Sequence, residues 1–297
     1  MYMIRVGVLR GGQGSAYEQS LAHGALVLRS LPKDLYRPVD IYIDRLGVWH
    51  AGGLPVTHET VKNSVDVAYD ATGQYSRVLE VLEIPHVHLS SFLSPLGENR
   101  FHVRNQLKKN GVRSPQSIGI AWEFGDEQEV AEAVTKVFRS FAPPYRVQAH
   151  SRTLARGSVR CATREELHDV LLRMASLGVA VVVREEVMGT PAQVLVAPGF
   201  RSVPAYTFMP VHESNPRLQF TTSESQKIQD VAKEAHKALG LKSYCTVQVV
   251  VTKQGRVYVT DIEACPQLND KPWVQNAFER VGASFSEFFH NLICQIF

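Results

Sequence analysis

Residues Thr246 to Asp270, TVQVVVTKQGRVYVTDIEACPQLND, decide the fold of this chain. The stretch contains two apolar runs, Val247 to Val251 and Val257 to Ile262, separated by a short segment that includes Lys253-Gln254-Gly255. Two apolar runs on either side of a glycine-containing turn are typical of a β-hairpin. We therefore predict two antiparallel strands joined by a tight loop.

Oxygen-bearing side chains lie at regular positions on this hairpin. Because side chains alternate between the two faces of a strand, Gln248 shares a face with Val250, and Asp261 shares a face with Glu263. Mg²⁺ binds carboxylate and amide oxygens, and waters and substrate phosphates complete its coordination. Two interpretations follow: the side chains form a magnesium–nucleotide site, or they are polar residues on the solvated face of the hairpin.

The composition is that of an ordinary globular protein. The chain has 297 residues, 44% of them hydrophobic, which is enough for two or three domains with their own cores. Its net charge of +3 gives no electrostatic reason to expect nucleic acid or a membrane as a partner. The cysteines form no CxxC pair, so we expect buried thiols in a reducing cytoplasm, without zinc or disulfides; they are Cys161, Cys245, Cys265 and Cys294.

The N-terminal region, residues 1–92, alternates apolar runs with helical patterns. Ile4 to Leu9 is an apolar run that leads into a glycine-rich segment, and a helical pattern follows from Ala16 to Leu31. We expect a first strand here and not a signal peptide, because Arg5 interrupts the run and no cleavage site follows. Further strands are predicted at 39–43, 65–69 and 84–87, a helix at 75–82 and an irregular loop at 49–55. This order predicts a parallel-sheet domain.

Two α+β regions follow, residues 93–178 and residues 179–297. In the first we predict helices at 100–110, 127–141 and 164–177 and strands at 145–149 and 157–161. In the second we predict strands at 179–183, 194–196 and 205–209 and helices at 223–239, 273–281 and 284–296, in addition to the hairpin. The predicted fold class is α/β, with a Rossmann-like N-terminal domain, a small central domain and a C-terminal domain.

Several strings resemble the D-alanine–D-alanine ligases of the ATP-grasp superfamily, in the same order and over nearly the whole chain. VLRGGQGSAYEQSLAHGALVLRSL is similar to the family's opening V-L-x-G-G-x-S-x-E-x-x-V-S-L, and VREEVMG to its hinge strand V-E-E-x-I-x-G. LEVLEIPHVH and SPLGENRFHVRNQLKKNGVRSP are similar to two further family segments. KIQDVAKEAHKALGLKSYCTVQVVVTKQGRVYVTDIEACPQLND follows the family's long helix, its A-R-V-D-F strand and its L-E-x-N-T-x-P-G-M-T signature without a change of register.

The resemblance implies an ATP-grasp fold in which ATP lies between the central and C-terminal domains and Mg²⁺ ions bridge its phosphates. In the family, ATP phosphorylates a carboxylate, and the amine of a second amino acid attacks the acyl phosphate. Positioning and charge neutralisation are what the protein contributes to such a reaction. The resemblance also implies D-alanine as substrate, a role in peptidoglycan synthesis for the cell wall, a cytoplasmic location and a homodimer formed through the N-terminal domain.

The expected nucleotide site is partly retained. The family's metal ligands correspond to three oxygen-bearing residues that keep two formal negative charges, namely Gln248, Asp261 and Glu263. The two lysines that hold the phosphates in the family correspond to Arg100 and Gln148, and in the loop after them only Gly157 keeps the pattern. At the adenine hinge Glu185 and Glu186 match the family's acidic pair. The backbone of Val187 and Met188 would there offer groups to the edge of the base.

The phosphate loop and the amino-acid sites are retained least. The loop carries Arg152 and Arg156, followed by Arg160, which either replace the lost lysine or form a solvated basic loop. The family's catalytic glutamate corresponds to Ala16, although the neighbouring Glu18 and Ser20 match its later E-V-S. Its catalytic arginine falls on Thr246 and its oxyanion-binding glycine on Gln267. We take four residues as candidate catalytic residues: Glu18, Ser20, Arg152 and Arg156.

Three functions remain open at this point. The first is a D-alanine–D-alanine type ligase with a rearranged site, and the second is a ligase that acts on other amino acids. The third is a homologue that binds a nucleotide, a ligand or a partner protein without ligation. The loss of one oxyanion donor costs about 10²- to 10³-fold in rate, so the altered positions bear directly on this choice.

Overall fold

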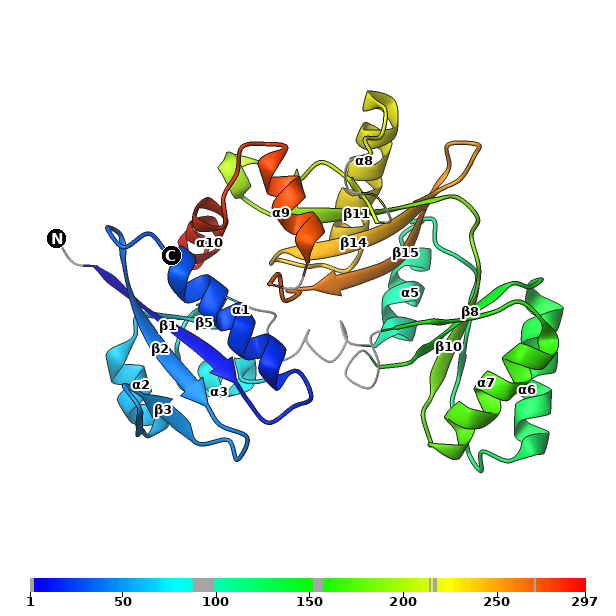
Figure 1. Ribbon diagram of the computed structural model, residues 1–297, viewed down its shortest axis with the longest axis horizontal. Helices are drawn as coiled ribbons and strands as arrows, with labels where there is room; N and C mark the ends of the chain where they lie inside the picture. The colour runs from blue at the N-terminus through cyan, green and yellow to red at the C-terminus, as the bar shows by residue number, and fades with distance from the viewer. Residues whose placement is uncertain (1–2, 88–98, 152–156, 214, 216–217, 270) are drawn as a thin grey trace.

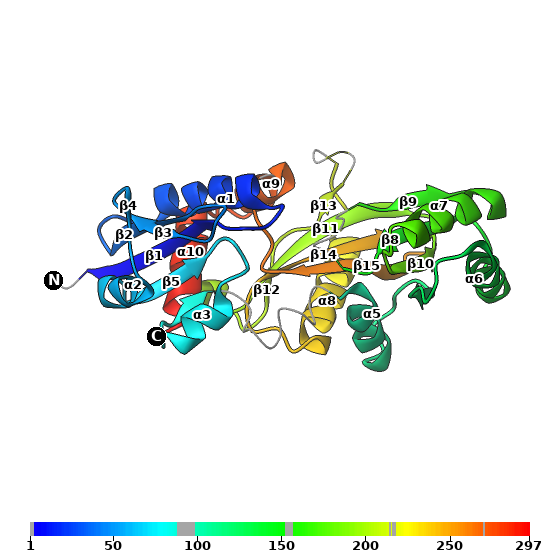
Figure 2. The ribbon, with the colours of Figure 1, turned by 90° about the horizontal axis from the view of Figure 1, so that it is seen from below.

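The computed structural model describes residues 3–87, 99–151, 157–213, 215, 218–269 and 271–297 (Figure 1). Within these residues the strands form three sheets. The C-terminal sheet lies in the middle of an elongated molecule, between the N-terminal and the central sheets (Figures 1 and 2). The α/β fold class predicted from the sequence is confirmed.

The N-terminal sheet has the strand order β4-β3-β2-β1-β5-β6. Its strands are β1 (Ile4–Gly11), β2 (Tyr36–Ile43), β3 (Trp49–Ala51), β4 (Leu54–Pro55), β5 (Val67–Asp70) and β6 (His86–Val87). Strand β1 pairs in parallel with β2 and β5, which confirms the predicted parallel sheet. The helices of this part are α1 (Tyr17–Ser30), α2 (His58–Ser64) and α3 (Ser76–Val81).

The prediction of an irregular loop at residues 49–55 is wrong. These residues form the short hairpin of β3 and β4, and β3 pairs antiparallel with β2. The turn between them is Gly52-Gly53, with positive φ at both residues. Two strands of three and two residues are too short to show a periodic pattern, so the pairing of β3 with β2 and of β4 with β3 defines them, and the local sequence does not.

The last helices of the chain complete the N-terminal core. They are α9 (Pro272–Glu279) and α10 (Phe285–Cys294). Phe288 and Phe289 of α10 share one buried cluster with Val6, Val8 and Val27 of the N-terminal domain. Helix α10 lies beside α1 in both views (Figures 1 and 2). The C-terminal segment therefore does not form a separate unit.

The central sheet has the order β7-β10-β8-β9, formed by β7 (Ser117–Ile120), β10 (Val181–Glu185), β8 (Tyr145–Ala149) and β9 (Val159–Cys161). Helices α6 (Glu127–Ser140) and α7 (Arg164–Ser176) pack on one face of it, against Val147, Val181 and Val183. Strand β10 pairs antiparallel with both β7 and β8. Strand β10 follows the predicted domain boundary at residue 178 in the sequence. In the structure it lies between β7 and β8 and belongs to the central sheet.

The C-terminal sheet has the order β12-β11-β14-β15, with β13 paired to β11. Its elements are β11 (Thr190–Ala197), β12 (Tyr206–Thr207), β13 (Val211–His212), β14 (Cys245–Val251), β15 (Val257–Ala264), the short η1 helix (Phe200–Ser202) and α8 (Thr222–Ala238). The predicted hairpin is confirmed as β14–β15, and Gly255 in its turn has φ +69. Helix α5 (Arg100–Lys109), predicted as part of the central domain, buries Val103 and Leu107 in the core of this sheet and α8.

All four cysteines are free thiols. Three are buried as expected, but Cys294 is exposed at the end of α10, so the prediction of a buried thiol is wrong there. Within the described ranges, no helix combines the length and the apolar character needed to span a bilayer.

Candidate functional site

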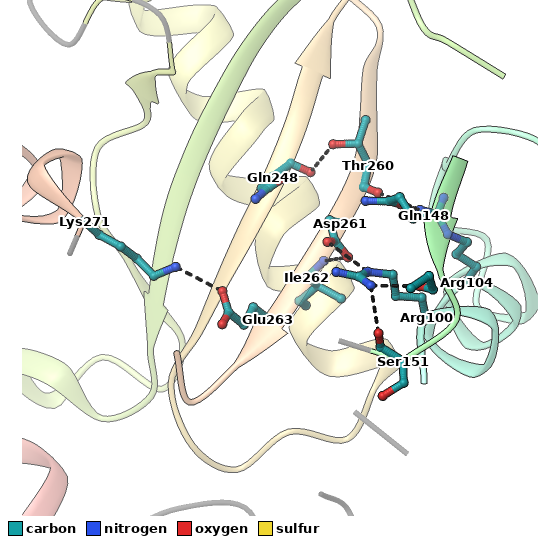
Figure 3. Close-up of polar contacts among 11 residues, drawn as sticks. Arg100, Arg104, Gln148, Ser151, Gln248, Thr260, Asp261, Ile262, Glu263 and Lys271 are labelled. Carbon is teal, nitrogen blue, oxygen red and sulfur yellow. Dashed lines mark hydrogen bonds and ion pairs between the residues drawn. The ribbon is translucent and has the colours of Figure 1, made fainter. Parts of the chain in front are cut away.

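The face of the hairpin that carries the predicted metal ligands is directed toward the central sheet (Figure 3). Gln248 pairs with Asp261, and Thr246 pairs with Glu263, with a register shift after Gln248. Directly paired residues share a face, so the oxygen-bearing side chains lie on one side of the sheet. The other side buries Val247 and other valines against α8.

Both carboxylates of this face already contact cations. The Oδ2 atom of Asp261 lies 3.8 Å from Nε of Arg100, and Oδ1 accepts a hydrogen bond from the backbone N–H of Ile262 at 3.0 Å. The Oε2 atom of Glu263 lies 3.0 Å from Nζ of Lys271. Lys271 approaches the hairpin from the side opposite to Arg100 (Figure 3).

These contacts do not fit a resident Mg²⁺ ion. Mg²⁺ is usually held by one or two carboxylates together with waters and substrate phosphates, whereas here each carboxylate of the hairpin already has its own positive partner. In the part of the chain that the structure describes, no group of three or more His, Cys, Asp or Glu residues could hold a metal ion. Gln248, Asp261 and Glu263 share a face as predicted, but the two carboxylates are arranged as partners of basic side chains.

Helix α5 ties the central sheet to the hairpin through two buried arginines. Arg100 donates from Nη1 to the carbonyl oxygens of Ala149, at 2.8 Å, and Ser151, at 3.3 Å. Arg104 donates from Nη2 to Oε1 of Gln148 at 2.8 Å and to the carbonyl oxygen of Thr260 at 3.3 Å. The predicted phosphate-binding residues Arg100 and Gln148 therefore both lie at this interface, each with a protein partner (Figure 3).

The central sheet presents arginines on the face opposite to α6 and α7. Arg146 of β8 pairs directly with Arg184 of β10 and with Arg160 of β9, so the three side chains share one face. The carboxylate of Glu186 lies between two of them, 2.7 Å from Arg146 and 2.6 Å from Arg160. Burial alone would raise the pKa of Glu186, but the hydrogen bonds from Arg160 and Arg146 hold this pKa below its usual value.

Arg184 is the arginine of this face with an unsatisfied donor. Its Nε atom is buried and has no hydrogen-bond partner among the described residues. Burial lowers the pKa of Arg184. The nearby charges of Asp261 and Glu186 raise this pKa, and the charge of Arg146 lowers it. Arg184 therefore lies within electrostatic range of both carboxylates.

Sequence reasoning missed several residues of this interface. Arg104, Arg146, Arg184 and Lys271 were not predicted as part of the site. A signal was present for one of them, because the alternation that places Gln148 on the polar face also places Arg146 there. No pattern in the sequence pointed to Lys271, which reaches Glu263 from the segment after the hairpin.

The predicted adenine hinge is only partly directed at this interface. Glu186 reaches the arginines, but Glu185 accepts a hydrogen bond from the backbone N–H of Gln116 at 2.9 Å. Val187 is half-buried and Met188 is 71% exposed. Gly157 is exposed, and the predicted catalytic residues Arg152 and Arg156 lie outside the described residues.

The predicted residues of the N-terminal domain have different environments. Glu18 is exposed and lies 2.9 Å from Arg45 in a surface ion pair. Ser20 is buried, and its hydroxyl accepts a hydrogen bond from the backbone N–H of Gly11 at 3.0 Å. Ser20 therefore stabilises the glycine turn.

A buried chain of hydrogen bonds anchors the segment after the hairpin to the N-terminal domain. Leu268 donates from its backbone N–H to Nδ1 of His23, so Nε2 of His23 carries the proton and donates to the hydroxyl of Tyr69. Tyr69 then donates to Tyr244, because Tyr244 uses its own proton on the carbonyl oxygen of Pro266. The distances from Nε2 onward are 3.1, 2.9 and 3.0 Å.

The three sheets, with an antiparallel central sheet whose polar face meets a C-terminal hairpin, have the architecture of the ATP-grasp proteins. The D-Ala:D-Ser ligase VanG from Enterococcus faecalis superposes with a TM-score of 0.82 at 18% identity, with 100% of both chains covered. A D-alanine–D-alanine ligase from Bacillus anthracis, solved in complex with ATP, superposes with a TM-score of 0.76 at 17% identity, covering 99% of this chain and 96% of the other.

Sequence comparison narrows this class. Residues 206–294 match the family described as D-ala D-ala ligase C-terminus. The chain is 23% identical over 319 residues to the D-alanine–D-alanine ligase of Carboxydothermus hydrogenoformans, covering 98% of this chain and 97% of the relative. It is 22% identical over 303 residues to that of Aquifex aeolicus, covering 98% and 100%. The chain is therefore similar over almost its whole length to D-alanine–D-alanine ligases, and its residues 206–294 match the C-terminal region of that family.

Proposed function

We propose that this chain is an ATP-dependent carboxylate–amine ligase of the D-alanine–D-alanine type, acting in the cytoplasm on precursors of peptidoglycan. One observation carries the proposal. The polar face of the central sheet meets the polar face of the β14–β15 hairpin, bridged by Arg104, in a chain similar over almost its entire length to such ligases. This interface supplies the positioned charges that phosphoryl transfer requires.

In the proposed reaction the terminal phosphoryl group of ATP passes to a carboxylate oxygen of the first amino acid, and ADP leaves. The amine of the second amino acid then attacks the acyl carbon, inorganic phosphate leaves, and the amine loses a proton. We propose that the nucleotide contacts the interface of the central and C-terminal sheets and that the amino acids bind nearer the N-terminal domain. Candidates for nucleotide contact are Arg100, Gln148, Glu186 and Gln248, and candidates for amino-acid contact are Glu18 and Ser20.

The first substrate to test is D-alanine, with the second amino acid left open. The structural neighbour from Enterococcus faecalis is a D-Ala:D-Ser ligase, so related folds differ in the second amino acid. We assign no resident Mg²⁺ to the hairpin, because Asp261 and Glu263 each have a cationic partner. A homodimer remains a proposal that the oligomeric state in solution would test.

A second candidate function is a nucleotide-binding homologue without ligase activity. The ion pairs of Asp261 and Glu263 favour it, since they occupy positions expected to hold metal. Two expected catalytic helpers are also absent. Thr246 is buried within the sheet, and Gln267 donates to the carbonyl oxygen of Ala71 at 3.3 Å.

The test measures phosphate release from ATP, and dipeptide by mass spectrometry, with D-alanine, then D-serine, then other amino acids. We expect release that depends on an amino acid. Gln248→Ala should slow this turnover by about twofold to tenfold, the range for one hydrogen bond. Gln254→Ala, an exposed residue in the turn of the same hairpin, is the matched control and should leave the rate unchanged.

Two results would decide against the ligase. If ATP binds but no amino acid stimulates phosphate release and no dipeptide forms, the nucleotide-binding homologue is the better description. If ATP does not bind, both candidate functions are removed.

A further inference from the structure

We infer that the interface between the central sheet and the hairpin binds the triphosphate of a nucleotide through arginine side chains, without a divalent cation held by the protein. This inference rests on the proposed function, because it places the nucleotide at the same interface. It differs from the expectation drawn from the sequence, in which Gln248, Asp261 and Glu263 hold Mg²⁺. We call the arginines involved the arginine cluster: Arg100, Arg104, Arg146, Arg160 and Arg184.

The charges of the interface favour an anion. The arginine cluster carries five guanidinium groups, and four of them contact or lie near two carboxylates, those of Asp261 and Glu186. The fifth, Arg104, bonds to Gln148 and to the carbonyl oxygen of Thr260. Lys271 and Glu263 form a pair of their own and do not change this balance. An excess of three positive charges in a partly desolvated site attracts a polyanion strongly, because screening by water is reduced there.

The geometry shows where a phosphate group would be held. Nε of Arg184 is buried without a hydrogen-bond partner among the described residues, so the cluster has a donor that no described residue uses. Arg146 lies on the neighbouring strand and Arg160 one strand further, and their side chains are 33% and 49% exposed, so both are accessible from solvent. A guanidinium group presents paired N–H donors that match two oxygens of a phosphate.

An incoming phosphate would replace a carboxylate that the arginines already bind. Glu186 accepts from Arg146 and Arg160 with one oxygen each, in the manner in which a phosphate would accept from both. Asp261 plays the same part for Arg100, at 3.8 Å. Both carboxylates therefore compete with the ligand, whereas in a magnesium site Asp261 would assist binding. Removal of the Asp261 charge should therefore strengthen ATP binding to the arginine site, whereas it would weaken ATP binding to a magnesium site.

The experiment measures ATP binding to the full chain by isothermal titration calorimetry, once in excess EDTA and once in excess Mg²⁺. We expect ATP to bind in EDTA at least as tightly as in Mg²⁺, because the metal screens the charges that arginines recognise. Arg184→Gln should weaken binding in EDTA by about tenfold to hundredfold, the range for a hydrogen bond to a charged group. The exposed Arg139→Gln, in helix α6 of the same domain, is the matched control and should bind as the wild type does.

The second variant is Asp261→Asn, which keeps the shape of the side chain and removes its charge. We expect it to tighten binding of ATP in EDTA, since it removes a competitor for Arg100 and Arg184. Thermal unfolding without ligand checks that each variant folds. If Arg184→Gln does not fold, Arg160→Gln replaces it, because this side chain is more exposed.

Binding of ATP only in Mg²⁺, with loss of binding in Asp261→Asn, would overturn the inference and leave the proposed function intact. Unchanged binding in EDTA for a folded Arg184→Gln or Arg160→Gln would also overturn it. If ATP binds in neither condition, the proposed function fails and the inference fails with it.

Discussion

Tyr69→Phe should destabilise the protein by about 2 to 4 kcal/mol through a hydrogen-bond chain that joins two domains. His23, Tyr69 and Tyr244 are almost fully buried, with exposures of 1%, 2% and 2%. The substitution removes a single hydroxyl that accepts from Nε2 of His23 and donates to Tyr244. The aromatic ring and its contacts with Phe289 remain, so the change isolates the hydrogen bonds.

The magnitude follows from the two bonds that are lost. The N–H of His23 is left buried without its acceptor, which costs about 1 to 3 kcal/mol, and the bond to Tyr244 contributes about 1 kcal/mol more. Tyr244→Phe leaves the hydroxyl proton of Tyr69 without its acceptor and should cost a similar amount. The double variant has neither of those hydroxyl groups. Its destabilisation should therefore be smaller than the sum of the two single effects, by about 1 kcal/mol or more.

The assay is urea unfolding of both single variants and the double variant, followed by tryptophan fluorescence. Burial raises the pKa of Tyr69 and of Tyr244 far above the usual value, so both hydroxyls stay protonated and the result should not change around neutral pH. Tyr258→Phe is the control, a half-buried tyrosine of β15 beside Arg113, and it should shift stability by less than about 0.5 kcal/mol. A Tyr69→Phe variant as stable as the wild type, or strict additivity in the double variant, would refute this reasoning.

Three further predictions concern local features of the fold. Gly11→Ala should destabilise the protein by more than about 2 kcal/mol, because Gly11 has φ +92 and a methyl group there would overlap the carbonyl oxygen of Ile43. The control is Gly52→Ala, at φ +59 in open space, which should cost only about 1 kcal/mol in the same urea assay. Burial lowers the pKa of His236 in the folded state below the unfolded value of 6.5, so the unfolded state binds more protons between these two pKa values. Stability should therefore fall as pH drops below 6.5. In thermal unfolding at a series of pH values, His236→Gln should flatten this dependence. Thr221→Ala removes the capping box of α8 and should cost about 1 kcal/mol, measured as a lower urea midpoint.

The local sequence specified much of the fold because periodic patterns repeat over many residues. The alternation in β14 and β15 placed Gln248, Asp261 and Glu263 on one face, as the register shows. Pairing between distant segments was not available in this way. Strand β10 continues an apolar run that reads equally well as the start of the C-terminal domain, and only its hydrogen bonds to β7 and β8 assign it to the central sheet.

The site was predicted less well than the fold, because the ability of a carboxylate to bind a metal or a ligand depends on the side chains beside it. Asp261 and Glu263 were identified as oxygen ligands from their spacing, but the cations beside them come from other parts of the chain. Arg100 was expected at the phosphates, and the side chain is in fact 1% exposed and bonded to backbone carbonyls. A family motif fixes which residue is present, whereas its partners decide whether a charge is free to bind a ligand.

The existing partners of the arginine cluster limit the affinity with which the interface of the central sheet and the hairpin binds an anion. Each guanidinium group that a phosphate contacts exchanges a protein partner for a ligand, so affinity is the difference between the two sets of interactions. Glu186 carries one negative charge shared by Arg146 and Arg160. A triphosphate carries more charge and more acceptor oxygens, and Arg184 offers it a donor that no described residue uses. The exchange therefore favours a polyphosphate over a single carboxylate, and this preference would give the interface selectivity for nucleotides over free amino acids.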